Sequence, residues 1–388
     1  MNNSETQRHL TPFETALFGV PINRLPTLLP GGLTVLIIAL ASHSLSDYLG
    51  SQLLGFEKSP ISPILIAIVF GFIFAGIFNL PMMLVPGVTF SIKKILRLGI
   101  ILLGIRLTIF DVFRLGAFGV PIVAVCILGS LIITTWINNK LELPERLGIL
   151  IAIGTSICGV TAIVAASPAI EAEEEESAYA IAVITIFGLF ATLFYPYLAN
   201  FILAGQANQV GLFLGTSVHE TAQVVGAGQI YADVFSQPLA LDIATITKLV
   251  RNVFMAAVIP IMALNYARRN EDSARTGADV SFAKLFPRFI LGFLTMALIR
   301  SLGDAGINAG GQAFGLLPGP AWSDVIASIK GWAELCLVIA LAGVGLSTNF
   351  RSLRELGIKP LFVGLAASSA VGVIGFIAIK VIGNLVVF

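Results

Sequence analysis

Long apolar segments follow one another along almost the whole chain. A helix needs about 20 mainly apolar residues to cross the hydrocarbon core of a bilayer, and the sequence offers roughly eleven such segments. They are residues 28–49, 61–79, 92–110, 117–138, 147–170, 178–203, 209–231, 239–265, 284–302, 325–347 and 360–387. The connections are short, so no soluble module fits between them. The pattern predicts an all-α polytopic membrane protein in which residues 1–388 form a single integral membrane domain, with a polar cytoplasmic N-terminus over 1–24 and a transmembrane region over 25–388.

Composition supports this fold class and limits the function. Of the 388 residues, 56% are hydrophobic and only 12% are charged, and the mean hydropathy is +0.93, whereas a soluble domain carries about 25% charged residues. A net charge of +1 with scattered basic residues argues against a nucleic-acid partner. The three cysteines have no paired spacing, so we expect neither a disulfide framework nor a metal site. The N-terminus shows no apolar stretch followed by a cleavage site, so we expect no signal peptide.

Basic residues in the short loops predict the orientation, because cationic loops stay cytoplasmic. The strongest signal is the loop from Tyr266 to Arg288, which carries Arg268, Arg269, Arg275, Lys284 and Arg288. Counting segments from that loop puts the loop of Lys140 and Arg146 and the N-terminus inside, and the C-terminus outside, in the periplasm of a bacterium. The same count puts the acidic run from Glu171 to Glu176 outside. We expect that run to be a solvated helix end, with cation attraction at a vestibule as the alternative.

A run of small and polar residues interrupts the segment 147–170. The stretch from Gly154 to Ser177 reads GTSICGVTAIVAASPAIEAEEEES. Exposed backbone is tolerated in hydrocarbon only where it faces protein or a wet cavity, and broken helices at mid-membrane depth mark substrate sites in transporters. We therefore predict a broken helix lining a site. Packing of small residues against a neighbouring helix is the alternative.

Two internal echoes indicate a repeat. Residues 104–116 (GIRLTIFDVFRLG) resemble residues 343–357 (GVGLSTNFRSLRELG), and the segment count puts the two loops on opposite sides, as an inverted repeat requires. The stretch GTSICGVTAIVAA from Gly154 likewise resembles GTSVHETAQVVGA from Gly215. Here both segments would run in the same direction. Either one of them does not fully cross, or a local chemistry is reused.

Polar side chains inside the apolar segments are the candidate functional residues, since a charge at the centre of a span costs about 2.5–3.5 kcal/mol. One cluster is His219, Glu220 and Gln223, at spacings that share a helical face. The other is Thr245, Lys248, Arg251 and Asn252, which make a polar stripe on an apolar helix. The alternatives are an interhelical polar pair for the first cluster and snorkelling of the two basic side chains for the second.

These groups suit the recognition of a small anion. Helix N-termini at a break direct backbone N–H groups at a ligand, an arginine fork matches oxyanion geometry, and a histidine or glutamate can exchange a proton. The sequence contains no HExxH, GxSxG or Walker-type motif, so metalloprotease and ATP-driven pump chemistry are not expected.

The motifs GTSICGVTAIVAASPAIEAEEEES, GTSVHETAQVVGAG and KLVRN with Pro260, together with GIILLGIRL, resemble the bacterial YeiH-type sulfate exporter family. The resemblance covers nearly the whole chain beyond residue 25, although a pattern that often reads His-Asp is His219-Glu220 here. It implies membership of the cation/proton antiporter and bile-acid symporter superfamily. It also implies an inverted-repeat transporter fold with two crossing broken helices, a mobile core, a scaffold and a homodimer in the bacterial inner membrane.

Residues and resemblance together predict a secondary transporter, not an enzyme, that exports sulfate or a related sulfur oxyanion or sulfonate by alternating access. Proton or sodium coupling is conceivable, and we expect no cofactor. The alternatives are a cation/proton antiporter using Glu220, a channel, and an intramembrane enzyme. The predicted substrate-binding residues are Ser156, Cys158, Gly159, Thr161, Ser217, His219, Glu220, Gln223, Lys248, Arg251 and Asn252.

Overall fold

The structure, a computed structural model, describes residue 14 and residues 18–53, 62–78, 80–269, 289–348 and 358–382. The side chains of the predicted basic loop beyond Tyr266 and residues 349–357 of the first echo lie outside this part. The elements in chain order are η1 (Ile22–Leu28), α2 (Leu29–Asp47), η2 (Tyr48–Leu53), α3 (Pro63–Phe78), α4 (Val85–Phe90), η3 (Ser91–Ile95), α5 (Leu96–Leu103), η4 (Gly104–Arg106), α6 (Ile109–Lys140), α7 (Glu145–Ser156), α8 (Val160–Ala166), η5 (Ser167–Ile170), α9 (Glu174–Ile202), α10 (Ala207–Ser217), α11 (Thr221–Phe235), α12 (Pro238–Val253), α13 (Met255–Arg269), α15 (Phe289–Gly310), β1 (Gln312–Ala313), β2 (Leu317–Pro318), α16 (Gly319–Ser347) and α18 (Ile358–Ile382).

The predicted class, an all-α polytopic membrane protein, is confirmed. In the described part of the chain, seven helices are long and apolar enough to cross a membrane, and α3 is a shorter apolar helix. Large apolar side chains such as Ile37, Phe113 and Ile132 are more than half exposed. Such a surface suits lipid, because large exposed apolar patches are rare on soluble monomers.

Segment 147–170 folds back on itself as a helical hairpin. A straight helix would separate Gly154 from Ile163 by about 13 Å, yet a Cβ placed on Gly154 would lie 2.8 Å from a side-chain carbon of Ile163. The carboxylates of Glu171 and Glu176, just after the hairpin, act electrostatically on Arg146, which stands at its start. The hairpin α7–α8 therefore enters and leaves at the same end of the molecule.

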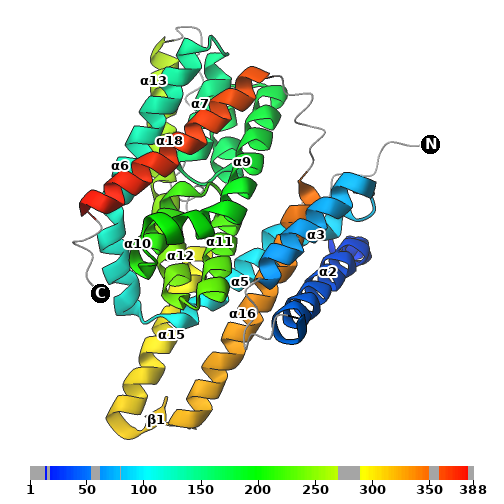
Figure 1. Cartoon of the computed structure of the whole chain (residues 1–388), viewed down its shortest axis with the longest axis vertical. Helices are drawn as coiled ribbons and strands as arrows, with labels where there is room; N and C mark the ends of the chain where they lie inside the picture. Colours follow the sequence, from blue (N-terminus) through cyan, green and yellow to red (C-terminus); the bar gives the residue numbers. More distant parts are fainter. Residues whose placement is uncertain are drawn as a thin grey trace.

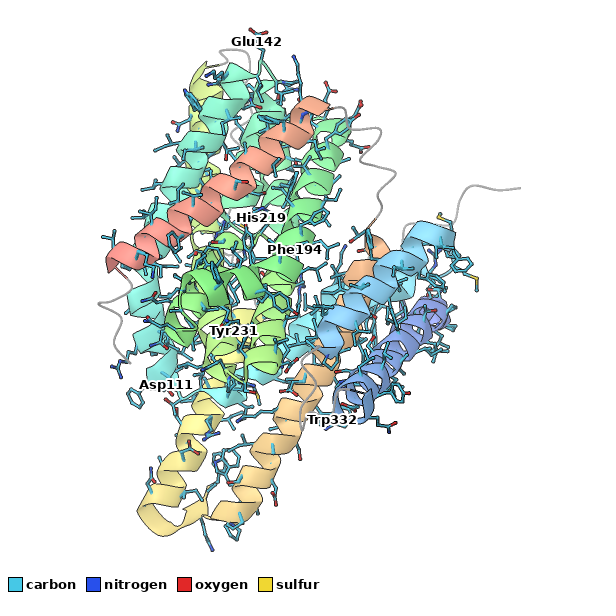
Figure 2. All side chains as sticks on the ribbon, viewed as in Figure 1. Asp111, Glu142, Phe194, His219, Tyr231 and Trp332 are labelled. Atoms are coloured by element: carbon cyan, nitrogen blue, oxygen red, sulfur yellow. The ribbon has the colours of Figure 1, made fainter. Side chains whose placement is uncertain are left out.

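Segment 209–231 forms a second hairpin. Helix α10 runs parallel to α12, because Gly211 packs on Ala240 while Gly215 packs on Ala244. Helix α11 runs antiparallel to α12, because Thr221 bonds Asn252 while Gly228 packs on Leu241. Helices α10 and α11 must therefore be antiparallel to each other. In Figure 2, His219 at the turn lies between Glu142 and Asp111, and Tyr231 lies nearer to Asp111.

The two hairpins enter from opposite ends. Helix α7 runs antiparallel to α12 and α13, since Arg146 bonds Tyr266 whereas Ile157 meets Lys248. Helix α10 runs parallel to α12, so α7 and α10 point at each other. Segments 147–170 and 209–231, both predicted to cross the membrane, are thus re-entrant hairpins. This resolves the direction conflict in the second echo. The two hairpins enter from opposite ends and so have opposite orientations, as an inverted repeat requires.

The hairpins also correct the placement of the acidic run. We expected Glu171 to Glu176 on the side opposite to the loop of Lys140 and Arg146, counting segment 147–170 as a crossing. That placement is wrong, because the carboxylates act on Arg146 itself. The run lies at the same end of the molecule as Glu142, which Figure 2 labels at the far end from Asp111.

Figure 1 shows two groups of helices. One, the hairpin core, contains α6–α13 and α18. The other, the outer group, contains α2–α5, α15 and α16. Helix α16 packs closely on α3, where a Cβ on Gly345 would meet the backbone nitrogen of Phe72 at 3.0 Å. Helix α11 is the part of the hairpin core that also contacts α3 and α16.

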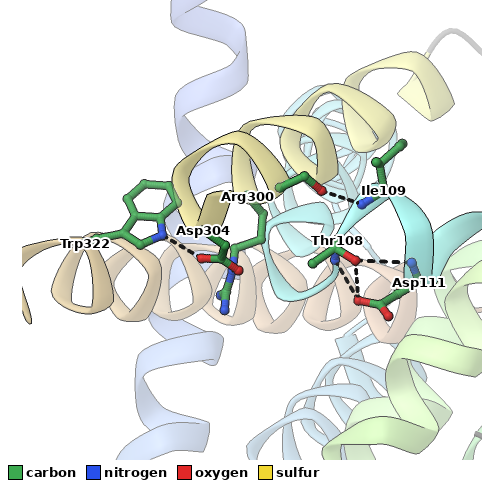
Figure 3. Close-up of polar contacts among 7 residues, drawn as sticks. Thr108, Ile109, Asp111, Arg300, Asp304 and Trp322 are labelled. Atoms are coloured by element: carbon green, nitrogen blue, oxygen red, sulfur yellow. Dashed lines mark hydrogen bonds and ion pairs between the residues drawn. The ribbon is translucent and has the colours of Figure 1, made fainter. Parts of the chain in front are cut away.

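Polar contacts lie where α6 of the hairpin core meets α15 of the outer group, and between α15 and α16 (Figure 3). Thr108 and Asp111 form a reciprocal capping box at the start of α6, and the Ile109 N–H donates to Ser301 Oγ at 2.8 Å. On α15, Asp304 accepts from Arg300 at 2.6 Å and from the Trp322 indole at 2.9 Å. These contacts fix α15 and α16 where they extend beyond the core toward β1 and β2.

The hairpins make a prediction about sidedness. Single cysteines at Glu142, Glu175, Ala204 and Gln237 occupy exposed positions, and the three native cysteines are buried. An impermeant maleimide applied to oriented vesicles is expected to label Glu142→Cys and Glu175→Cys from one side, and Ala204→Cys and Gln237→Cys from the other. Labelling of Glu142→Cys and Glu175→Cys from opposite sides would show that segment 147–170 crosses.

Candidate functional site

Both hairpins turn at the centre of the core, in sequences that favour a break. Helix α7 ends at Ser156 and α8 begins after Gly159, which has φ +68°. Helix α10 ends at Ser217, and α11 begins after Glu220. The predicted break at Cys158 and Gly159 is confirmed, and the second break lies in the stretch that echoes it.

Glycine is needed at position 159 for two reasons. Its positive φ is a conformation that other residues rarely adopt. In addition, a Cβ at this position would lie 2.5 Å from Cγ of Glu220 in the other hairpin. The two turns therefore touch at Gly159 and Glu220.

Lys248 of α12 joins the carbonyl ends of α7 and α10. Its side chain is 0% exposed. The ammonium donates to the carbonyl oxygen of Ile157 at 2.8 Å, to that of Val218 at 3.1 Å, and to that of His219. A lysine has three donors, so all of them are used by backbone of the two turns.

Arg251, one helical turn further along α12, makes the same kind of bridge. Its Nε donates to the Ser156 carbonyl at 2.5 Å, and its Nη1 donates to those of Thr216 at 2.6 Å and Val218 at 3.2 Å. Its Nη2 donates to the Thr155 carbonyl. The guanidinium is 1% exposed. Each GTS sequence thus ends a half-helix whose carbonyls accept from Arg251.

These contacts have a clear electrostatic cause. The last four carbonyls of a helix lack partners, and the aligned peptide dipoles put about half a negative charge at that end. Two such ends meet head-on, and two cations lie between them. In the described part of the chain, no carboxylate lies within 4.0 Å of Lys248 or Arg251. The helix ends themselves are therefore the counter-charge.

Glu220 lies at the opposite, amino-terminal ends of the half-helices. It forms a reciprocal capping box with Gln223 at the start of α11. Its Oε1 also accepts from the Val160 N–H at 3.3 Å, at the start of α8. One carboxylate therefore serves two positive helix ends, which suits the dipole of each.

The other predicted residues differ in their surroundings. Cys158 is buried, with its Sγ 3.7 Å from Met255 Sδ, in an apolar cluster. Ser156 Oγ donates to Ser130 Oγ at 2.9 Å. Gln223 Nε2 donates to the Thr185 carbonyl at 3.0 Å. Thr161 is exposed at the start of α8. Thr245 only bonds the Leu241 carbonyl of its own helix, so it takes no part in the turns.

Several polar atoms around the turns have no hydrogen-bond partner among the described residues. They are Thr155 Oγ1, Ser217 Oγ, His219 Nδ1 and Asn252 Oδ1. Buried polar groups are nearly always paired, so water or a ligand is expected beside them. His219 Nε2 already forms a hydrogen bond of 2.6 Å with Ser368 Oγ. Ser368 was not predicted, although its position in an otherwise apolar segment was a signal.

Known proteins match the chain over most of its length. The model of the family described as Conserved hypothetical protein 698 matches residues 31–364. A UPF0324 membrane protein of Bacillus cereus is 31% identical over 90% of this chain and 93% of its own length. One from Corynebacterium glutamicum is 30% identical over 93% of both chains. Another, from Bacteroides thetaiotaomicron, is 32% identical over 89% of this chain and 97% of its own length.

The chain belongs to this YeiH/UPF0324 family. The resemblance given by the GTS motifs is thereby confirmed. The relatives are described as membrane proteins, in agreement with the apolar helices of the structure, so the chain is a multi-pass membrane protein.

The carbonyl bridge predicts the effect of removing its central charge. Replacing Lys248 by Met leaves the buried carbonyls of Ile157 and His219 without a donor, and Val218 then accepts from Arg251 alone. It also removes one of the two positive charges that separate the negative ends of α7 and α10. We expect a loss of about 3 kcal/mol or more of stability, seen as a lower melting temperature of the purified protein in detergent. Lys380→Met, at an exposed position on α18, is the matched control. Equal melting temperatures for both variants would mean that Lys248 does not hold the turns together.

Proposed function

We propose that this family member is a secondary transporter of a small anion, in the bacterial inner membrane. The cargo class is sulfate or a related sulfur oxyanion or sulfonate, and the mechanism is alternating access at the two hairpin turns. The homodimer implied by the resemblance is part of the same proposal.

One observation carries the proposal. The carbonyl ends of α7 and α10 are closed by the fully buried Lys248 and Arg251, whereas the residues at the amino-terminal ends, Val160, Glu220 and Thr221, are partly accessible. Helix N-termini attract anions through free N–H groups and the helix dipole. The accessible side of the turns thus favours a negatively charged ligand.

The opposed hairpins support transport in particular. Each hairpin reaches the centre from its own end, so the shared site is separated from each side by a different pair of short helices. Broken helices that meet at the midplane are typical of secondary transporters, whose repeats rock against each other around the site. A channel or an enzyme does not require this arrangement.

Glu220 gives the proposal a coupling step. Its carboxylate occupies the two positive helix ends, so it competes with any cargo anion for the same N–H groups. Protonation of Glu220 removes that competitor. Cargo binding and proton uptake are then favoured together.

A second candidate rests on the same residue. In a cation/proton antiporter, Glu220 binds the cation and Lys248 and Arg251 only balance the helix ends. Asn252 Oδ1, an acceptor with no hydrogen-bond partner in the described part of the chain, favours this second function. The two functions differ in the role of the Glu220 carboxylate. In the anion transporter it competes with the cargo, whereas in the antiporter it binds the cation.

A Glu220→Gln variant separates the two. In proteoliposomes loaded with sulfate, we expect saturable counterflow of labelled sulfate by the wild-type protein, increasing as the pH falls. In Glu220→Gln, counterflow should persist and lose its dependence on pH, because the neutral amide behaves like the protonated acid. Sulfite, thiosulfate and sulfonates are tested as competitors. Glu145→Gln, at the exposed start of α7, is expected to behave as the wild type.

Other results would contradict the proposal. Loss of all transport in Glu220→Gln, together with sodium uptake driven by a pH gradient in the wild type, would establish the antiporter. Flux that does not saturate and shows no counterflow would indicate a channel, and a chemically changed substrate would indicate an enzyme.

A further inference from the structure

A polar cavity lies between the outer group and the hairpin core, apart from the turns. Its volume is about 180 Å³. The polar side chains that line it include His43 and Asp47 of α2, Gln229 and Asp233 of α11, and Glu334 of α16. None of these residues belongs to the site proposed for the anion. Asp47 is one of the few acidic residues at the end of an apolar segment, and the proposed transport mechanism gives it no role.

Asp233 fixes the orientation of Gln229 in this cavity. Asp233 Oδ1 accepts from Gln229 Nε2 at 2.8 Å, and its Oδ2 accepts from Ser62 Oγ at 2.8 Å. Rotating the amide by 180° would place two oxygens against each other, so the nitrogen must face Asp233. Gln229 Oε1 is then left as an acceptor without a partner among the described residues. The residue is only 5% exposed, and a buried acceptor of this kind calls for a positive ligand or a donor.

The charges of the cavity point the same way. Asp47, Asp233 and Glu334 bring carboxylates from three different helices. Arg106 lies 3.9 Å from Glu334 but forms its short contact, 2.5 Å, with Asp242. Carboxylates on three walls of the cavity disfavour an anion and suit a cation.

We propose that this cavity binds a small hard cation, Na⁺ in the first place. Amide and carboxylate oxygens are ligands of hard cations, and Gln229 Oε1 is the ligand already turned toward it. Within the described residues, no group of three or more His, Cys, Asp or Glu side chains is arranged to hold a metal ion. That finding argues against a transition metal or a tightly caged divalent ion. At about 30 Å³ per water, the cavity holds a cation that keeps several waters.

The position of the site gives it a structural consequence. Its ligands come from α2 and α16 of the outer group and from α11 of the hairpin core, so the cation ties the two groups together. Binding is therefore linked to one arrangement of the two groups and raises its stability. The inference goes beyond the proposed anion transport and holds whether or not sulfate is the cargo.

The test is binding of Na⁺ to the purified full-length protein. We expect saturable binding of ²²Na⁺ and a saturable rise of the melting temperature with NaCl, at an ionic strength kept constant with N-methylglucamine chloride. Li⁺ is compared as a second small cation. Gln229→Met removes the free oxygen and keeps the volume of the side chain, so binding should weaken by at least about tenfold, the change that corresponds to about 1.4 kcal/mol. Asp47→Asn, on the opposite wall, should act in the same direction.

Asp324→Asn is the matched control, since it removes the same charge from an exposed position on α16 and should leave binding unchanged. Equal stabilisation by NaCl and N-methylglucamine chloride would overturn the proposal. So would ²²Na⁺ binding that Gln229→Met and Asp47→Asn leave intact. Because binding is measured directly, a variant with a lower melting temperature still reports on the site.

Discussion

The head-on meeting of two helix carboxyl ends is the constraint on which the rest of the structure depends. Helices α7 and α10 approach each other from opposite ends of the molecule, and each brings unpaired carbonyls and a partial negative charge to the centre. That meeting would be unfavourable in a medium without water. Lys248 and Arg251 make it stable, because together they donate to carbonyls of both turns. The usual cost of burying a cation is offset here by hydrogen bonds to helix-end carbonyls that have no partner within their own helix.

The same constraint explains why two stretches far apart in sequence look alike. Gly154-Thr155-Ser156 and Gly215-Thr216-Ser217 each end a half-helix at the same pair of cations. Small residues allow close approach to neighbouring helices, as at Gly215, where a Cβ would lie 2.6 Å from Thr247. The echo is therefore a structural repeat of the turn, with the second copy inserted from the opposite end.

Much of this could be predicted from the sequence, because burial of charge in lipid is costly enough to single out its residues. Lys248 and Arg251 stood out for that reason, and both point at the predicted break. The re-entrant course of the two hairpins could not be predicted. A segment of 24 apolar residues has the length of a crossing helix, and its periodicity does not report whether a break is a kink or a reversal. The only signal was the direction conflict between the two segments of the second echo, and the packing of α10 and α11 on α12 was needed to resolve it. The acceptors of the Lys248 ammonium could not be predicted either, because every residue has a backbone carbonyl and the sequence does not show which of them the lysine reaches.

Helix α11 connects the two polar regions of the molecule. Its N-cap is Glu220 and its first turn carries Gln223, both near the hairpin tips, and its last turns carry Gln229 and Asp233 in the cavity shared with the outer group. From residue 221 to 233 a helix spans about 18 Å, and a packed helix moves as one body because close-packed interiors transmit displacement. If the cavity binds a cation as proposed, that cation would restrain the hairpin tips through α11. A rigid α11 is therefore sufficient to link the position of the polar groups at the hairpin tips to that of the polar groups in the cavity.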